Sequence, residues 1–248
     1  MTDSIKHYGL IGKSLTHSFS QKYFTRKFKE EAIAADYASC EIQKIEDCQA
    51  LFTNNFNGFN VTIPYKETII PYLTKLDDTA REVGAVNTIK VTKDGNKKVL
   101  IGYNTDVIGF EQSLIPLLKS HHKNALILGT GGASKAVAYV LTRLNISFEY
   151  VSREAGVHKL SYHELSQQLI TDSSLIINTT PLGMFPDTSS YPNIPYSALT
   201  ENHLLFDLVY NPEETEFLKK GKALGSNIKN GLEMLELQAE AAYKIWID

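Results

Sequence analysis

The sequence has very few of the residues that support disulfide or metal-bound folds. It contains only two cysteines, Cys40 and Cys48, and one tryptophan in 248 residues. The cysteines lack the spacing of metal ligands, which indicates a reducing compartment, and we assign neither thiol a role. We therefore expect no metal site.

Long apolar runs and an excess of positive charge are also missing. Nowhere do 18 consecutive apolar residues occur, and the start MTDSIKHYGL lacks the apolar core of a signal peptide. The formal net charge of −3 provides no basic field for nucleic acid and no polybasic patch for a membrane. We expect a cytoplasmic protein, a monomer or homodimer, that acts on a small molecule and binds neither nucleic acid nor membrane.

What remains is the composition of an ordinary globular protein, with 43% hydrophobic and 21% charged residues. The length suits one large or two medium domains. Strands and helices alternate regularly over 124–230, whereas 1–104 form a separate α/β block that contains at least one hairpin. The pattern predicts an α/β protein with two blocks, and the cleft between such blocks is the natural ligand site.

The most distinctive segment is 124–145, NALILGTGGASKAVAYVLTRLN. A short apolar run ends at Gly129, further glycines follow at 131 and 132, and apolar residues then recur at spacings of three and four. This order predicts the first strand, turn and helix of a dinucleotide-binding unit, in which a pyrophosphate approaches backbone N–H groups at the helix N-terminus. Ser134 stands where the usual fingerprint has its third glycine.

The next predicted strand, Ile146–Arg153, indicates which nucleotide binds. NAD-binding folds place Asp or Glu at this point to hold the ribose 2′-hydroxyl. Here Ser152 and Arg153 occupy it, and a guanidinium pairs with a 2′-phosphate that an acid would repel. The sequence therefore favours NADP, although Glu154 is a conflicting neighbour.

Polar residues in the first block gather at the ends of predicted elements. Ser18 and Ser20 precede a helix, where either hydroxyl could cap the helix or bind a ligand. Asn60 and Thr62 alternate along one strand and so share a face, and Lys66 follows just beyond it. A surface role remains the alternative for this lysine.

The rest of the pattern supplies the connecting elements. His121-His122-Lys123 is expected to be a solvated connector rather than a metal site, because no further ligands stand at a plausible spacing. Residues 161–170 have the pattern of an amphipathic helix, and 76–82 are also expected to be helical. In the C-terminal helix from Leu232, Gln238 lies near the apolar stripe, as either a core amide or a ligand.

Seven segments together resemble shikimate dehydrogenases along nearly the whole chain. They are THSFS, GFNVTIPYKE, GAVNT, GYNTD, GTGGAS, DLVYNP and NGLEMLELQAE, all in the family's order. The resemblance implies NADPH-dependent, reversible reduction of 3-dehydroshikimate to shikimate, the fourth step of chorismate and aromatic amino acid biosynthesis. It also implies a substrate domain, 1–106 plus 232–248, and a Rossmann-type doubly wound NADP-binding domain, 107–231.

The resemblance further assigns roles to single residues. Lys66 and Asp106 are the implied catalytic pair, which also contacts substrate, with Tyr210 between substrate and nicotinamide. Six other side chains are implied to hold the substrate's carboxylate and hydroxyls: Ser18, Ser20, Asn60, Thr62, Asn87 and Gln238. The implied cofactor residues are Gly129, Gly131, Gly132, Ala133 and Ser134 at the pyrophosphate, Ser152 and Arg153 at the 2′-phosphate, Leu208 and Gly231 at the nicotinamide, and Asp78 at the cofactor's edge.

The implied chemistry suits these residue types. When hydride adds to the carbonyl carbon, the oxygen becomes an alkoxide that needs a proton, which Lys66 can donate while Asp106 orients the ammonium. A free lysine titrates near roughly 10.4 and is therefore an acid at neutral pH. A lysine cation also fills the role of an electrophile, so no metal is required.

Some residues depart from the family pattern, and other functions stay open. Lys13-Ser14 replaces a common Asn-Pro, Gln21 replaces a proline, and Glu233 replaces a glycine. One alternative is a quinate or quinate/shikimate dehydrogenase that uses NAD. A methylenetetrahydrofolate dehydrogenase shares the cofactor domain, but the polar residues suit a small polyol acid better than a pterin. A non-catalytic sensor on this fold would be expected to lose Lys66 and Asp106, and both are present.

Overall fold

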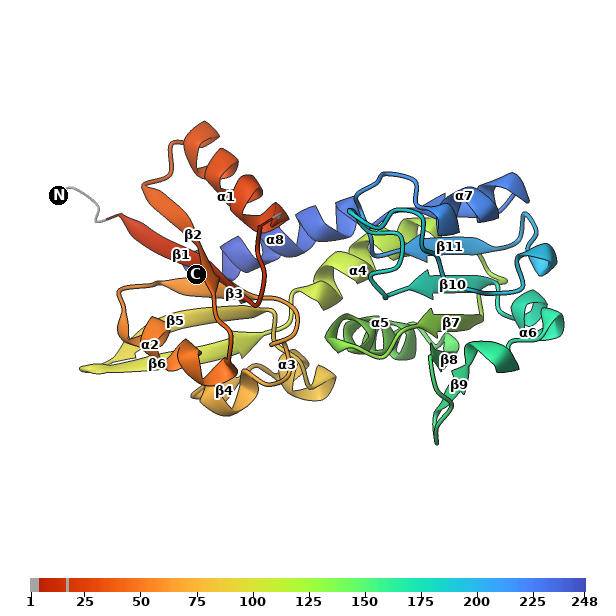
Figure 1. The fold of residues 1–248 in the computed structure, drawn as a ribbon. Helices are drawn as coiled ribbons and strands as arrows, with labels where there is room; N and C mark the ends of the chain where they lie inside the picture. The colour runs from red at the N-terminus through yellow and green to blue at the C-terminus, as the bar shows by residue number, and fades with distance from the viewer. Residues whose placement is uncertain (1–4, 17) are drawn as a thin grey trace. The chain divides into compact units, whose positions relative to one another are not determined.

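The computed structural model describes residues 5–16 and 18–248, so His17 of the THSFS segment lies outside it. The chain forms two compact units: Met1–Thr105 with Ala239–Asp248, and Asp106–Gln238. Each unit contains one six-stranded sheet with helices, which confirms the predicted α/β class (Figure 1). Among the described residues, no helix is long and apolar enough to cross a membrane.

The sheet of the first unit has the strand order β2-β1-β3-β5-β6-β4. The three strands β1, β2 and β3 are parallel, whereas β5 pairs antiparallel with β3 and with β6, and β4 lies parallel to β6. The bounds are β1 Lys6–Gly12, β2 Ala35–Glu41, β3 Gly58–Val61, β4 Lys75–Leu76, β5 Thr88–Asp94 and β6 Lys97–Tyr103. The expected hairpin is the β5–β6 pair, with Gly95 at a φ of 57° in its turn.

Helices cover both faces of this sheet. On one face, α1 (Phe19–Glu30) and the last part of α8 (Leu232–Ile247) enclose an aromatic core with Tyr8, Phe24 and Trp246. On the other face, α2 (Cys48–Thr53) and α3 (Asp78–Val83) cover a second core around Phe59. Both cysteines are free and buried on this second side.

Trp246 anchors the end of α8 to this unit. Its ring stacks on Tyr8 at 4.5 Å between centroids, and its Nε1 donates to the Ile89 carbonyl at 3.0 Å. A Cβ at Gly58 would lie 2.4 Å from the indole, so only glycine leaves room for the ring. The apolar residues that recur along the C-terminal helix thus pack the end of α8 against the first sheet.

The second unit is a doubly wound parallel sheet of order β12-β11-β10-β7-β8-β9. Its strands are β7 Asn124–Leu128, β8 Ser147–Ser152, β9 Lys159–Ser161, β10 Leu175–Asn178, β11 Leu204–Asp207 and β12 Asn227–Lys229. Its remaining helices are α4 Asp106–Leu114, α5 Gly132–Arg143, α6 Gln167–Asp172 and α7 Glu216–Ala223. The strands that follow β7 in the chain, β8 and β9, lie on one side of it, and the later strands β10, β11 and β12 lie on the other. The strand order therefore reverses between β7 and β10.

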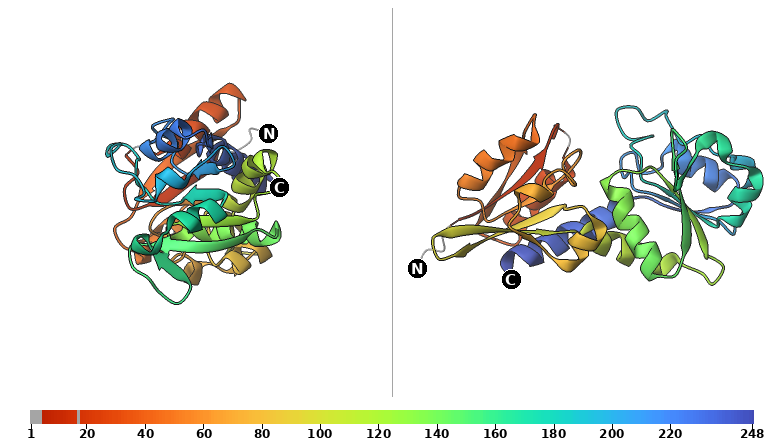
Figure 2. Two further views of the ribbon diagram at one scale, coloured as in Figure 1. Left: turned by 90° about the vertical axis from the view of Figure 1, so that its right-hand side faces the viewer. Right: turned by 90° about the horizontal axis from the view of Figure 1, so that it is seen from below.

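Alternation along the buried strands directs side chains to two helix layers. Leu126 and Ile176 lie in a core with Phe217 of α7, whereas Phe206 meets Phe110 of α4 in an edge-on contact at 5.1 Å. Figure 2 shows α5 and α7 on opposite faces of this sheet. Both faces of the parallel sheet are therefore buried, as in other doubly wound folds.

Three local predictions were wrong. Residues 161–170 do not form one helix: β9 ends at Ser161, a 3₁₀ turn covers Tyr162–Glu164, and α6 begins after Ser166. The side chains of Ser161, Glu164 and Ser166 bond nearby backbone or hydroxyl groups and so compete with a continuous helix. The helix expected at 76–82 begins only at Asp78, because Leu76 belongs to β4.

The third error concerns His122, which was expected to be solvated. Its side chain is only 3% exposed, and its Nδ1 accepts a hydrogen bond from the Lys119 backbone N–H at 2.9 Å. Burial, with the neighbouring His121, lowers the pKa of His122. Among the described residues, no group of three or more potential metal ligands occurs.

Candidate active site

The polar residues of the first unit form a buried hydrogen-bond network where β3 ends and β5 begins. Asn60 is 5% exposed, and its Nδ2 donates to the Asn87 carbonyl at 3.3 Å and to the Thr88 hydroxyl at 3.2 Å. The Asn87 Oδ1 accepts from the Thr105 N–H at 2.7 Å and from the Thr105 hydroxyl at 3.1 Å. The two predicted asparagines are therefore held in fixed orientations by Thr88 at the start of β5 and by Thr105 between β6 and α4.

Ser18 and Ser20 lie at the start of α1. Ser18 caps the helix by accepting from the Gln21 N–H at 3.5 Å. The bond is long and weak, and it agrees with the helix-cap alternative for this serine. Ser20 hydrogen-bonds the phenol of Tyr37, whose hydroxyl donates to the Asn60 Oδ1 at 2.7 Å. Burial raises the pKa of Tyr37 well above its ordinary value, and the bond from Ser20 opposes that shift. Tyr37 thus joins Ser20 to the asparagine network.

Thr62 and Lys66 complete the set in this unit. The Thr62 N–H donates to the Ile11 carbonyl at 2.9 Å, which continues the β1–β3 pairing past the end of the strand. The Lys66 carbonyl accepts from the Val86 N–H at 2.7 Å, so the backbone of this lysine lies beside the residue before Asn87. Both side chains are partly exposed. The structure therefore brings Asn60, Lys66 and Asn87 to one corner of the first sheet.

Asp106 and Gln238 lie in the second unit, where α4 crosses α8. Asp106 is the first residue of α4 and is 6% exposed. One turn later, a Cβ on Gly109 would lie 2.4 Å from the Met234 carbonyl and 3.1 Å from the Gln238 Cβ. Glycine is required for this close helix contact. Gln238 is also 6% exposed, and its Nε2 donates to the Leu235 carbonyl at 2.9 Å.

The glycine turn between β7 and α5 has the features of a phosphate site. Gly129 has a φ of 111°, which favours glycine, and a Cβ there would lie 2.6 Å from the Thr179 Oγ1. Gly131 is the N-cap of α5 but offers no side-chain cap, and a Cβ on it would meet nothing within 4 Å. The first N–H groups of a 12-residue helix therefore face a space left open by glycine, next to Gly132 and Ala133.

Ser134 does not disturb this turn. It is 1% exposed, and both its N–H and its hydroxyl donate to the Gly131 carbonyl, at 2.9 and 2.7 Å. A small hydroxyl residue thus fills the place of the third glycine and stabilises the turn internally.

A pocket of about 270 Å³ lies beside the turn. Two lysines and a histidine line it together with residues of the turn and β8: Lys135, His158, Lys159, Thr130, Ser134, Tyr150 and Val157. Arg153 is exposed and is not among the lining residues. Ser152, at the end of β8, uses its hydroxyl to donate to the Glu154 carbonyl. Sequence reasoning missed this grouping of two lysines and a histidine, because they become neighbours only when β8, β9 and α5 assemble.

The residues predicted to line the nicotinamide follow β11 and precede α8. Leu208 and Gly231 lie in contact, since a Cβ on Gly231 would lie 2.2 Å from the Leu208 carbonyl. Tyr210, two residues further along the same loop, is half-buried, and burial raises its pKa. These three residues thus belong to one loop cluster at the carboxyl edge of the second sheet.

Asp78, predicted to lie at the edge of the cofactor, pairs with a residue of its own helix. It opens α3 and is exposed, and Arg81 of the same helix donates to its Oδ1 at 2.5 Å. The sequence did not indicate Tyr37 and Thr105, which orient the two asparagines, because no local pattern marks a residue that acts by holding another side chain. Thr105 does stand inside the GYNTD segment, which was the available signal.

Residues 10–89 match a family model described as the shikimate dehydrogenase substrate binding domain. Shikimate dehydrogenase (NADP(+)) from Methanococcus vannielii is 38% identical over 96% of this chain and 90% of its own. Shikimate dehydrogenase 1 from Peptoclostridium difficile has a crystal structure with a TM-score of 0.86 and 36% identity, covering 98% of this chain and 92% of that one. Quinate dehydrogenase from Corynebacterium glutamicum, solved in complex with NAD, has a TM-score of 0.85 and 26% identity over 98% and 94%.

Proposed function

The chain belongs to the shikimate dehydrogenase family, and on that premise we propose that it reduces 3-dehydroshikimate to shikimate reversibly with NADPH. The single observation that carries this proposal is the pair of hydrogen-bonded amides, Asn60 and Asn87, with the Lys66 backbone beside them at one corner of the first sheet. In its biological setting, the reaction serves chorismate and aromatic amino acid biosynthesis.

The first unit binds the substrate in this proposal, with Gln238 added from α8. The amides of Asn60 and Asn87 and the hydroxyls of Ser18, Ser20 and Thr62 can bond a carboxylate and several hydroxyl groups. Because Tyr37 and Thr105 hold the two asparagines, little side-chain entropy is lost when substrate binds. Such a polar, preorganised set matches a small polyhydroxylated acid.

The second unit holds the dinucleotide. The open glycine turn and the uncapped N-terminus of α5 fit a pyrophosphate, and Leu208, Tyr210 and Gly231 lie on the nicotinamide side. When bound, NADPH supplies the hydride. The chain's own residues then handle the proton: Lys66 donates it to the developing alkoxide, and Asp106 orients the lysine ammonium and shares the substrate hydroxyl.

NADP is preferred over NAD because of the cations at the adenosine end. Arg153 at the end of β8 pairs with a 2′-phosphate, and the pocket beside the turn adds Lys135, His158 and Lys159. The alternative is an NAD-linked quinate dehydrogenase, which the similarity to the Corynebacterium glutamicum enzyme favours. We further assign the enzyme to the cytoplasm, in accord with its free cysteines, as a monomer or homodimer.

A direct assay tests this proposal. Purified protein is incubated with shikimate and NADP⁺, and formation of NADPH and of 3-dehydroshikimate is followed together. We expect equimolar appearance of both products and reversal when 3-dehydroshikimate and NADPH are supplied. Absence of turnover with shikimate and with quinate, using either nucleotide, would contradict an enzymatic role.

A further inference from the structure

A buried carboxylate, Asp207, connects the two loops that follow β10 and β11. It is the last residue of β11, lies opposite Asn178 of β10 in the sheet, and has no exposed surface. Its Oδ1 accepts from the Asn178 Nδ2 and from the Val209 N–H, both at 3.0 Å. Its Oδ2 accepts from the Thr215 hydroxyl at 2.6 Å.

Each of these partners fixes a different stretch of chain. Val209 lies between Leu208 and Tyr210 in the loop after β11, so the bond from its N–H to Asp207 fixes the backbone there. Thr215 is the N-cap of α7, where its Oγ1 accepts from the Leu218 N–H at 3.4 Å. Asp207 therefore clamps the loop after β11 at its first residues and at its last.

Asn178 extends the same network to the loop after β10. Its Oδ1 accepts from the Thr180 N–H at 3.0 Å and from the Thr180 hydroxyl at 2.6 Å. The two loops also meet directly, because the Phe185 N–H donates to the Asn211 carbonyl at 3.1 Å. Asn178 and Thr215 have no exposed surface, so water cannot replace these bonds.

The position of this network in the sheet relates it to the cofactor. In doubly wound folds the pyrophosphate lies at the glycine turn, and the strand carrying the ribose-binding residue receives the adenosine half. Here these are β7 and β8, so the nicotinamide half extends over β10 and β11, whose carboxyl ends carry the two loops. Asp207 lies beneath them and cannot touch the nucleotide, since it is fully buried.

We propose that Asp207, with Asn178 and Thr215, is a positioning group that holds the Leu208–Tyr210 backbone in the conformation that receives the nicotinamide. The proposal rests on the proposed function for the identity of the ligand. It assigns to this network an effect on the nicotinamide half of the cofactor and none on the adenosine half.

The test compares two ligands on each variant. NADPH carries both halves of the cofactor, whereas 2′,5′-ADP carries the adenosine and 2′-phosphate without nicotinamide. Thr215→Val removes one hydrogen bond to the carboxylate, and we expect it to raise the Kd of NADPH about tenfold. The Kd of 2′,5′-ADP and the KM of shikimate should stay unchanged, and Thr215→Ser, which keeps the hydroxyl, should restore NADPH binding.

The matched control is Thr142→Val. Its hydroxyl donates to the Ala138 carbonyl at 2.9 Å near the end of α5, away from the carboxyl edge of the sheet. This variant should bind both ligands normally. If Thr215→Val fails to fold, Asp207→Asn tests the same point, because its amide cannot accept from all three donors.

Two results would overturn the proposal while leaving the proposed function intact. One is equal weakening of NADPH and 2′,5′-ADP, which would indicate a general structural role. The other is an unchanged Kd of NADPH in Thr215→Val or, if that variant does not fold, in Asp207→Asn. Failure of the unaltered protein to bind NADPH at all would instead contradict the proposed function.

Discussion

At the scale of single residues, Lys66 is placed by its backbone rather than by a buried side chain. Its carbonyl accepts from the Val86 N–H, next to Asn87 in the chain, and the residue is partly exposed. A cation in this position can reach a substrate that Asn60 and Asn87 orient. In the proposed function the fixed amides serve substrate binding, whereas the lysine serves proton transfer.

Lys66→Ala should therefore lower kcat by about 10²–10⁴-fold, the usual range for loss of a general acid. The Kd of shikimate should change little, because the asparagines and serines remain. Steady-state kinetics and calorimetric binding measure the two effects separately. Lys75→Ala, which removes an exposed lysine of β4, is the control and should be fully active. Near-normal kcat in Lys66→Ala would show that the lysine is not the proton donor.

Two cations that we propose to lie at the adenosine end can be compared in the same way. Arg153→Ala should raise the KM of NADPH at least about tenfold while leaving that of NADH unchanged, since only NADPH carries the 2′-phosphate. Lys159→Ala tests the pocket beside the turn and should likewise raise the KM of NADPH relative to the KM of NADH. If a variant raises the KM of NADPH and the KM of NADH equally, the substituted residue does not bind the 2′-phosphate.

The sequence predicted residues that lie in motifs and missed residues that act through other side chains. Asn60 and Asn87 stand in segments typical of the family, and the structure places them together. Tyr37 lies in an ordinary β-strand, and only the fold shows that its hydroxyl orients Asn60. His122 was misjudged because three polar residues in a row resemble a loop, whereas its burial depends on neighbours distant in sequence such as Asn202 and His203.

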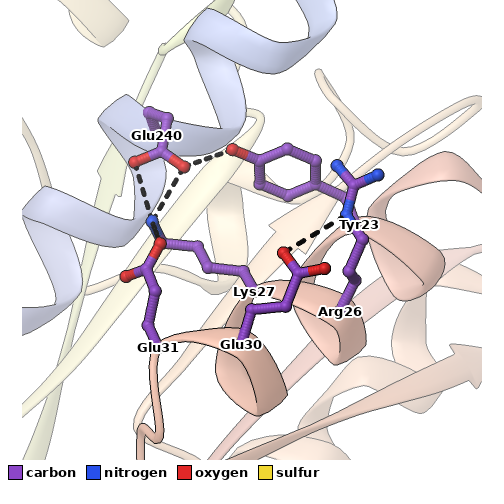
Figure 3. A network of polar contacts seen from close by, with 6 residues as sticks. All are labelled: Tyr23, Arg26, Lys27, Glu30, Glu31 and Glu240. Atoms are coloured by element: carbon purple, nitrogen blue, oxygen red, sulfur yellow. Dashed lines mark hydrogen bonds and ion pairs between the residues drawn. The ribbon is translucent and has the colours of Figure 1, made fainter.

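At the scale of elements, α1 and the end of α8 are joined by a polar link within the first unit. Figure 3 shows the Glu240 carboxylate between Tyr23 and Lys27 of α1. The Tyr23 hydroxyl and the Lys27 Nζ both donate to it, the latter at 3.1 Å, and Lys27 also bonds Glu31 at 2.8 Å. Burial would raise the pKa of Glu240, but these donors outweigh it and lower the pKa.

Lys27→Met should lower the free energy of unfolding by about 1 kcal/mol, the upper end for partly exposed ion pairs. The effect should decrease on acidification, because a carboxylate with a lowered pKa contributes stability above its unfolded value and loses it as pH falls through the folded value. Denaturant titrations at neutral and acidic pH measure it. Arg26→Met is the control, since Arg26 and Glu30 are exposed and 4.0 Å apart; an equal effect of both changes would contradict the account.

The sequence predicted most elements because their periodicity is local, and it was wrong where short-range caps compete. The run from Leu126 through the glycine turn into α5 has one consistent pattern, and the structure follows it. In 161–170 the apolar spacing favours a helix, but Ser161 and Ser166 each begin a separate turn. Hydrogen bonds of a few side chains thus override a weak periodic signal.

At the scale of the whole molecule, the second unit keeps a buried carboxylate that costs stability at neutral pH. Burial raises the pKa of Asp207 from its ordinary value of 3.8 to about 6, although three hydrogen bonds oppose the shift. The folded state therefore holds this proton more tightly than the unfolded state. The stabilising contribution is complete below pH 4 and is lost as pH rises through 6.

We expect the unfolding free energy of the unaltered protein, measured relative to Asp207→Asn, to fall by about 2 kcal/mol between pH 4 and pH 7. Taking the difference between the two proteins removes the other titrating groups, including His122. Denaturant unfolding across this range provides the measurement. A difference that is flat or rises with pH would contradict the raised pKa.

The central claim is that this chain is an NADP-linked shikimate dehydrogenase, and the specificity constant tests it most directly. kcat/KM is measured for the four pairings of shikimate or quinate with NADP⁺ or NAD⁺. We expect kcat/KM for shikimate with NADP⁺ to exceed that of each other pairing by at least about tenfold, because NAD⁺ lacks the 2′-phosphate and quinate carries an additional hydroxyl. A highest value for quinate with NAD⁺ would contradict it.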